Sequence, residues 1–555
     1  MDEILVAKEI LDTYEDIVIS NIIENKIFFL LKNNEYVLFL FSRNEKTSFP
    51  AILTKSEIAF CYPHFMQPEY QLIHDIQDQY GVVCLRESDT TIKYLLTYEE
   101  KIIDTIERLR HLLALTPLEI EKEFQKEFLF YWNSAASSTK AELYIGDIKS
   151  FSKMNSYISS DLKIRVIGSG IKLNDKDHER NGVKLWKFQH DTPFFYIPII
   201  DNRRIVPPTA RNKWSARNIN QIINGREFCS ISHDTFEQIK REQIKTKKVG
   251  LVFEMYVDGN SYAFCCVLTF KNSVMGSLYS KIVNSITAIE IAESKRLDFI
   301  HLCKLIGNDA ALSNKRVLLI GCGSLGSYVA EDLVKAGFRN IDIYDGETLS
   351  NENVLRHRLN WLWAGCSKAV AMKHKLESIH PEVCVNAFSD SMDIDRLIKT
   401  ANTFDLIIFT VGSSDVQLNL NCLLFEKKYD KPVIFSWLEA GGVYSHILYV
   451  DYHNKGCFEC LYTDSNGDLV NNKVNHLSES ENDKYVIRNG CGATRVAYGT
   501  EILLRTTSAI LNIVNKIYRG DITGNSLINI DSSSVSNAGN TFLERKCACC
   551  GDRDN

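Results

Sequence analysis

A glycine-rich run from Gly321 to Gly326 constrains the fold of this chain more than any other segment. Apolar residues at 317–320 precede it, as in a buried strand, and apolar residues at helical spacing follow it. Gly321, Gly323 and Gly326 therefore form a G-x-G-x-x-G pattern between a strand and a helix. Glycines there let backbone N–H groups approach phosphate, and a helix N-terminus favours negative charge. The segment predicts the phosphate-binding turn of a nucleotide site.

Strand-like apolar runs recur beyond this turn, separated at first by helical patterns. They lie at residues 341–344, 383–387, 406–411 and 433–435. The alternation predicts an α/β fold with a doubly wound, Rossmann-like parallel sheet. Asp345 ends the second strand, about 20 residues beyond the glycines, where an acid suits a ribose hydroxyl. The pattern does not specify the nucleotide, so an NAD-dependent oxidoreductase stays open as an alternative.

The length of 555 residues predicts three or four domains at the usual domain size. We expect three blocks, at residues 1–135, 140–303 and 304–555. The first reads as an α+β domain, with a helix near 4–19, strands near 27–31, 36–41 and 52–53, and helices over 98–114 and 118–132. The middle block mixes strands and loops, including a hairpin that turns at Asp258-Gly259, and carries no chemical motif.

The charge balance excludes some classes of partner. Lys and Arg number 64 and Asp and Glu number 70, so the net charge of −6 creates no field that would attract nucleic acid or anionic membrane. The acidic N-terminus lacks the features of a signal peptide, and no apolar stretch approaches the roughly 18 residues of a membrane helix. We therefore expect a soluble cytoplasmic protein with no membrane or nucleic-acid partner.

Sixteen cysteines in a reducing compartment are expected to be core residues, metal ligands or nucleophiles. Two C-x-x-C pairs predict a tetrahedral structural zinc site, with Cys549 as an alternative to Cys550. The expected ligands are Cys457, Cys460, Cys547 and Cys550. Four other thiols are expected to serve packing: Cys322, inside the glycine-rich turn, and Cys366, Cys384 and Cys422, among apolar residues.

Cys491 lies between the two pairs and is flanked by Gly490 and Gly492. A helical run from about Val496 onward would place this thiol near a helix N-terminus, which lowers a thiol pKa. Cys491 is therefore a candidate nucleophile, with a buried structural thiol as the alternative.

Residues 345–357 resemble the Asp-x-Asp…Asn-x-x-Arg-Gln signature of the ThiF/MoeB/ubiquitin-activating family, although Glu347 and His357 replace its second Asp and its Gln. That family also has two zinc pairs with a transferring cysteine between them. The resemblance implies an adenylation domain that binds ATP and Mg²⁺. It further implies that Arg356 and Lys368 neutralise triphosphate charge, that Asp415 holds the metal, and that Asn353 positions a phosphate.

Residues 74–85 resemble the conjugating-enzyme segment H-P-N-x₄-G-x-I-C-L, which makes Cys84 a second candidate nucleophile. Asp75 and Ile76 stand where the proline and the oxyanion-stabilising asparagine are expected. Either another group supplies that function or the domain is degenerate. A buried cysteine at a strand end is the structural alternative.

Together the two segments resemble the bacterial fused ubiquitin-conjugating and ubiquitin-activating enzymes of CBASS antiphage defence. The resemblance implies adenylation of a partner's C-terminus, thioesters on Cys491 and then Cys84, and conjugation to a lysine. The implied partner is a CD-NTase-like or ubiquitin-like protein, the implied cofactors are ATP, Mg²⁺ and Zn²⁺, and the implied assembly is a homodimer. Two alternatives remain besides the oxidoreductase. One is an activating enzyme for a ubiquitin-like or sulfur-carrier protein with a non-catalytic N-terminal adaptor, and the other is a binding module with an inactive ATP site.

Overall fold

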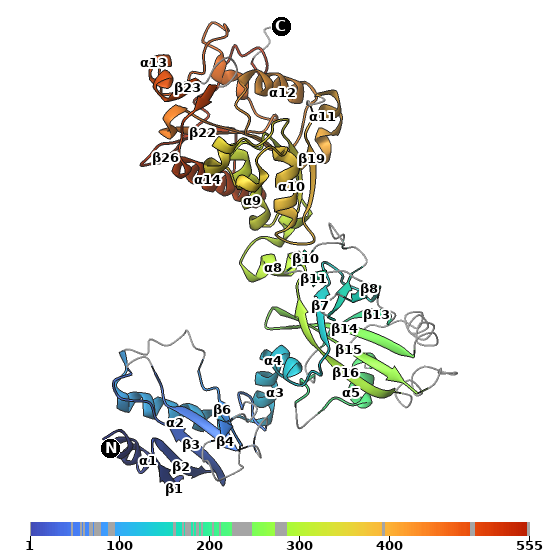
Figure 1. Ribbon diagram of the computed structural model, residues 1–555, viewed down its shortest axis with the longest axis vertical. Helices are drawn as coiled ribbons and strands as arrows, with labels where there is room; N and C mark the ends of the chain where they lie inside the picture. The colour runs from blue at the N-terminus through green and yellow to red at the C-terminus, as the bar shows by residue number, and fades with distance from the viewer. Residues whose placement is uncertain are drawn as a thin grey trace. The chain divides into compact units, whose positions relative to one another are not determined.

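The computed structural model divides into two compact units (Figure 1). One comprises Met1–Leu143, Ile148–Ser169 and Lys187–Arg296, and the other comprises Tyr144–Asp147, Gly170–Trp186 and Leu297–Asn555. The structure describes residues 2–45, 48–55, 58, 61–65, 70–71, 79–86, 95–158, 162–168, 171, 179–180, 183–184, 188–189, 192–201, 205–209, 213–224, 247–271, 286–390, 394–488 and 494–551. No helix in these ranges is both long and apolar enough to cross a bilayer.

The first unit begins with an antiparallel sheet in the order β1-β2-β3-β4-β6-β5. Its elements are α1 (Asp2–Leu11), β1 (Ile17–Ile23), β2 (Lys26–Leu31), β3 (Asn34–Phe39), β4 (Ala51–Lys55), β5 (Tyr70–Gln71), β6 (Gln79–Val83) and α2 (Tyr98–Leu113). The helix expected over 4–19 ends at Leu11, because β-branched Ile17, Val18 and Ile19 pair with β2 instead. The helix expected over 98–114 is confirmed and begins with a Thr97–Glu100 capping box.

The helix expected over 118–132 is two helices, α3 (Pro117–Lys126) and α4 (Phe128–Ser134), because the backbone leaves the helical region at Glu127. On α4, Phe128 and Trp132 pack on Phe264, with ring centroids 4.6 and 4.5 Å away. Both belong to the core of the sheet that follows. Helix α4 therefore joins the described N-terminal residues to the described middle block within one compact unit.

The middle block forms an eight-stranded sheet in the order β12-β8-β13-β14-β15-β16-β7-β9. Its main elements are β7 (Lys140–Tyr144), β8 (Ser152–Ile158), β9 (Ile164–Ile167), β12 (Phe188–Gln189), β13 (Phe194–Pro198), α5 (Ala216–Asn224), β14 (Lys248–Val257), β15 (Asn260–Phe270) and β16 (Ile286–Arg296). The hairpin prediction is confirmed, because β14 and β15 pair across Asp258 and Gly259, both of which have positive φ. Two positive φ values are typical of the type I′ turn that suits twisted hairpins.

The second unit contains an eight-stranded sheet in the order β19-β18-β17-β20-β21-β22-β25-β26. The first five strands are mutually parallel and the last three are antiparallel. The elements are α8 (Phe299–Leu305), β17 (Arg316–Ile320), α9 (Ser324–Ala336), β18 (Asn340–Tyr344), α10 (Lys368–Glu377), β19 (Cys384–Phe388), α11 (Ile394–Thr400), β20 (Leu406–Phe409), α12 (Ser414–Glu426), β21 (Val433–Leu438), β22 (Ser445–Val450), α14 (Thr500–Arg519), β25 (Ser526–Ile530) and β26 (Val535–Gly539). The predicted doubly wound α/β fold is confirmed.

The central strand β17 shows why this sheet needs helices on both faces. Val317 and Leu319 enter one core with residues of α9, α10 and α14, whereas Leu318 and Ile320 enter another with residues of α11 and α12 (Figure 1). Successive side chains of a strand alternate between faces, so a continuous apolar strand is buried on both sides.

Candidate active site

The glycine-rich turn lies at the carboxyl end of β17, beside the ends of β18 and β20. A Cβ added to Gly326 would lie 2.1 Å from the backbone oxygen of Gly321, and Gly321 itself has a φ of +94°. These two glycines are therefore required by packing and backbone conformation. At Gly323 a Cβ would meet nothing within 4 Å, so this position leaves open space at the N-terminus of α9.

Asp345 braces the glycine-rich turn. Its Oδ2 accepts the N–H of Cys322 at 2.6 Å, and its Oδ1 accepts the N–H of Glu347 at 2.9 Å. Burial raises the pKa of this carboxyl group, and the two hydrogen bonds oppose that shift. The residue expected to hold a ribose hydroxyl thus also supports the loop backbone.

His357 is a second residue that supports the glycine-rich turn, and its side chain is buried, with the residue 6% exposed. Its Nδ1 accepts the N–H of Leu359 at 3.0 Å, which leaves the proton on Nε2, 2.9 Å from the oxygen of Cys322. Burial lowers the pKa of His357 to about 4. A glutamine offers the same donor and acceptor, so the histidine serves where the family signature has Gln.

Two cationic side chains expected to bind phosphate lie in different surroundings. Lys368 begins α10, is 4% exposed, and forms an ion pair with the mostly exposed carboxylate of Glu347. Arg356 ends a short 3₁₀ helix over Asn351–Arg356 and donates to Asn353 Oδ1 at 3.1 Å. The Arg356 Nε is buried and has no partner among the described residues.

Arg356 also connects this site to a second structural element. Its Nη1 donates to the oxygen of Val496 at 2.6 Å, and its guanidinium lies 4.7 Å from the centre of the Tyr498 ring. Val496 ends strand β24 (Thr494–Val496), which pairs with β23 (Val486–Arg488). Arg356 therefore bridges the candidate nucleotide site and this hairpin.

Cys491 lies outside the described residues, in the sequence that connects β23 to β24. The expected helix from about Val496 begins instead at Thr500, because β24 and the residues after it are extended. Eight residues of sequence lie between Cys491 and the first residue of α14, and the lowered thiol pKa stays a prediction because Cys491 is not among the described residues. Asp415 is exposed in the first turn of α12, just beyond the carboxyl end of β20.

A buried carboxylate that the sequence analysis missed anchors the segment between Cys460 and this hairpin. Glu439 accepts the N–H groups of His476 and Leu477, each at 2.8 Å, and pairs with His446. Nearby, the Gly441 N–H donates a hydrogen bond to the backbone oxygen of Ala497, just after the hairpin, at 2.7 Å. The signal that could have found this cluster is His446 itself, a titratable residue within the apolar run of β22 that must have a partner.

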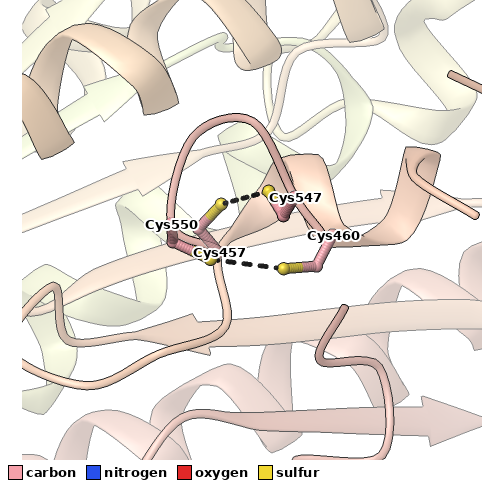
Figure 2. A group of neighbouring side chains, drawn as sticks. All are labelled: Cys457, Cys460, Cys547 and Cys550. Carbon is pink, nitrogen blue, oxygen red and sulfur yellow. Dashed lines mark hydrogen bonds between the residues drawn. The ribbon is translucent and has the colours of Figure 1, made fainter. Parts of the chain in front are cut away.

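The two C-x-x-C pairs come together as predicted from their spacing. Figure 2 shows four buried sulfur atoms turned toward one another, with 3.8 Å between Cys457 and Cys547 and 3.3 Å between Cys460 and Cys550. All four lie within 4.8 Å of one another. Tetrahedral zinc with Zn–S bonds of about 2.3 Å would separate its ligands by about 3.8 Å, so the group fits that ion.

The remaining thiols divide by environment. Cys549 lies outside the cluster, with its sulfur 3.4 Å from Asn421 Nδ2. Cys322 is buried as predicted and Cys422 is half-buried. The packing prediction was wrong for Cys366 and Cys384, which are exposed because one precedes α10 in a loop and the other points outward from the edge strand β19.

Cys84 is exposed directly after β6, and its N–H donates to the oxygen of His64 at 2.9 Å. The residues His74, Asp75 and Ile76, on which the conjugating-enzyme resemblance partly rests, lie outside the described residues. His64 was not singled out from the sequence, and its neighbourhood with Cys84 depends on strand pairing.

A family model and several known proteins are similar to parts of this chain. Residues 301–536 match the model of the ThiF family. The chain is 32% identical over 135 residues to the "ATP-dependent ubiquitin transferase-like protein Cap2" of Enterobacter hormaechei subsp. hoffmannii, covering 23% of this chain and 22% of that protein. The Cap2 protein of Vibrio cholerae is 26% identical over 36% of this chain and 33% of its own length. "Ubiquitin-like modifier-activating enzyme 5" of Bombyx mori is 24% identical over 28% of this chain and 42% of its own length. The chain thus spans under half the length of these relatives.

Among solved structures, E. coli MccB with succinimide is 20% identical with a TM-score of 0.33, covering 44% of this chain and 67% of that chain. E. coli MccB with AMPCPP and MccA is 19% identical with a TM-score of 0.34, covering 43% of this chain and 67% of that chain.

Proposed function

Because residues 301–536 form a ThiF-family domain, we propose that this chain adenylates the C-terminal carboxylate of a partner protein and then transfers the acyl group through thioesters to an amine. The observation that carries the proposal is the gathering of the glycine-rich turn, Asp345, Arg356 and Lys368 at one edge of the parallel sheet. Ligands of doubly wound sheets bind where parallel strands end.

The first step joins the partner's carboxylate to AMP. A carboxylate oxygen attacks the α-phosphorus of ATP, a new P–O bond forms, and pyrophosphate leaves with the electron pair of the broken bond. Arg356 and Lys368 would stabilise the developing negative charge, since Arg356 is already bonded to Val496 and Lys368 is buried at the start of α10. Asp415 would hold Mg²⁺, which when bound supplies charge neutralisation at the phosphates.

The later steps move the acyl group between thiols. The Cys491 sulfur would attack the acyl carbon and AMP would leave, after which Cys84 and finally an amine would accept the acyl group. The bond from Arg356 to Val496 supports this order, because it attaches the hairpin flanking Cys491 to the nucleotide site. The exposure of Cys84 suits a thiol that must meet a second protein.

The cysteine cluster would hold Zn²⁺ through Cys457, Cys460, Cys547 and Cys550. These donors join two segments about ninety residues apart in sequence, so a bound metal would attach the C-terminal segment to the residues after β22. The resemblance also suggests a CD-NTase-like partner in antiphage defence and a homodimeric enzyme, which light scattering would test.

The test measures ATP–pyrophosphate exchange and AMP release by the full chain with a candidate partner protein. Asp415→Asn should lower both rates by about 100-fold. Asp430→Asn is the matched control, because this exposed aspartate precedes β21 at the opposite edge of the sheet and should leave both rates unchanged. Exchange that survives Asp415→Asn, or binding of NAD in place of ATP, would refute the proposal.

A second candidate function is activation of a ubiquitin-like or sulfur-carrier protein, with the N-terminal residues acting as an adaptor. The variant Cys84→Ala distinguishes this function from the proposed thioester relay. In the relay it abolishes the final conjugate and leaves a reductant-sensitive adduct on Cys491, whereas in the adaptor reading conjugation or sulfur transfer continues.

A further inference from the structure

The surroundings of Cys84 contain a histidine and two carboxylates that the proposed relay does not yet use. Phe65 and Val83 form an antiparallel bridge, which places His64 opposite Cys84. The Cys84 N–H completes this arrangement by donating to the His64 oxygen at 2.9 Å. Residues directly opposite each other in such a pair are close neighbours.

The backbone of His64 is held in an uncommon conformation. Its φ is +67°, in the left-handed region that few residues other than glycine adopt. The His64 N–H donates to the Tyr131 hydroxyl at 2.6 Å, so helix α4 holds the residue in place. Backbone strain that the surroundings maintain is concentrated at functional sites in proteins.

The imidazole of His64 faces an acidic surface at the junction of α3 and α4. Its Nδ1 lies 3.1 Å from Glu127 Oε1, and its Nε2 lies 3.8 Å from Glu123 Oε2. The Tyr131 hydroxyl donates to the other Glu127 oxygen at 3.3 Å, which fixes that carboxylate. The hydrogen bond with Glu127 raises the pKa of His64. The ring thus faces Glu123 and Glu127, the Tyr131 hydroxyl fixes Glu127, and Cys84 lies opposite His64 in the backbone pairing.

We propose that His64 is the general base for aminolysis of the Cys84 thioester, with Glu127 orienting its ring and Glu123 accepting a hydrogen bond from the incoming neutral amine. This inference rests on the proposed relay and adds the residue that completes its last step. A carboxylate that binds Nδ1–H leaves the Nε2 lone pair available as a base.

The chemical step balances without any further reactant. The amine nitrogen attacks the acyl carbon of the thioester, and a C–N bond forms as the C–S bond breaks. The Cys84 sulfur leaves with the electron pair as a thiolate, and the proton lost by the nitrogen moves to His64 Nε2. Attack by a small thiolate needs no such proton transfer, which provides the test.

The experiment loads Cys84 of the full chain with a synthetic peptide α-thioester and follows the acylated Cys84 peptide by mass spectrometry. Single-turnover discharge is then measured with free lysine and, separately, with a small thiol. His64→Asn should slow discharge to lysine by about 100-fold and leave discharge to the thiol unchanged. Asparagine tolerates the left-handed backbone, so this variant should fold normally.

Two further variants test whether His64 acts as a general base or only supports the local structure. Glu127→Gln removes the charge that raises the His64 pKa, so the ascending limb of the pH–rate profile with lysine should move to lower pH. His111→Asn, on the exposed end of α2, is the control and should behave as the parent chain. The role of His64 would be refuted, and the relay would stand, if His64→Asn left the rate of discharge to lysine unchanged. The same holds if it slowed discharge to lysine and to the thiol equally. Absence of any acyl group on Cys84 would overturn the relay itself.

Discussion

The carboxylate of Glu439 and the imidazole of His446 form a fully buried pair, with 2.7 Å between Oε1 and Nε2. The other ring nitrogen of His446 lies 2.8 Å from Asn529 Oδ1, so the histidine is held on both sides. Rings also stack in sequence from Trp437 to His446, from His446 to His476, and from His476 to Tyr444. Together these contacts attach the segment around residue 476 to strands β21 and β22.

Replacing Glu439 with glutamine should loosen this segment. The free energy of unfolding should fall by about 2 kcal/mol, because backbone N–H groups lose a charged acceptor. Burial raises the pKa of Glu439, but hydrogen bonds from His446, His476 and Leu477 lower it from 4.5 to about 2. The carboxylate therefore stabilises the fold above pH 4.5, and this contribution is lost as the pH falls toward 2. Amide exchange at residues 476–477 and acid titrations of unfolding measure both effects.

Glu501→Gln is the control for this change, because its side chain is 82% exposed at the start of α14. It should leave amide exchange at residues 476–477 unchanged. Equal exchange rates in Glu439→Gln and the parent chain would show that the carboxylate does not hold the segment.

Two glycines of the phosphate turn should respond differently to alanine. Gly326→Ala places a methyl group 2.1 Å from a backbone oxygen, so we expect a loss of about 3 kcal/mol of stability. Gly323→Ala meets no neighbour within 4 Å, so stability should persist while ATP affinity falls by about tenfold, equivalent to about 1.4 kcal/mol. Thermal unfolding and ATP titration distinguish the two. Unaltered ATP affinity in Gly323→Ala would argue that phosphate binds elsewhere.

His357 should be replaceable by glutamine and by no apolar residue. Gln retains one donor for the Cys322 oxygen and one acceptor for the Leu359 N–H, whereas Leu leaves both unsatisfied. Because burial lowers the pKa of His357 from 6.5 to about 4, the unfolded chain takes up its proton first, and stability falls as the pH drops from 6.5 to 4. His357→Gln should remove this pH dependence, and His357→Leu should cost about 2 kcal/mol. Unfolding measured across that range tests both.

The metal content of the chain should depend on Cys550 and not on Cys549. Cys550→Ser removes one of four converging thiols and should reduce bound zinc to a small fraction. Cys549→Ser changes a thiol whose sulfur faces Asn421, so the metal content should stay near one ion per chain. Elemental analysis of purified variants measures this, and equal zinc loss in the two would contradict the assignment.

The regular parts of the fold could be predicted because their signals are local. The glycine pattern needed only a buried strand before it, and the turn at Asp258-Gly259 needed only two residues that accept positive φ. The helix expected over 4–19 failed because apolar Ile17 and Ile19 satisfy either a helix or a strand, and the pairing with β2 decides between them.

The candidate site was predictable in its residue types and less so in its contacts. The C-x-x-C spacing selected all four clustered thiols, since each pair is local in sequence. The roles of Glu439 and His64 depend on partners 37 and 63 residues away, which no spacing rule reveals. The helix expected to begin at about Val496, after Cys491, shows the same limit, because composition alone does not distinguish the hairpin strand at Thr494–Val496 from the start of a helix.

Helix α4 presents one face to the surroundings of Cys84 and the other to the middle sheet. Tyr131 binds His64, while Phe128 and Trp132 are packed against Phe264. A rigid helix of seven residues cannot shift one face without the other. A change in the packing of the middle sheet is therefore expected to reach the surroundings of Cys84 through this helix, as a coupling between two sites that share no direct contact.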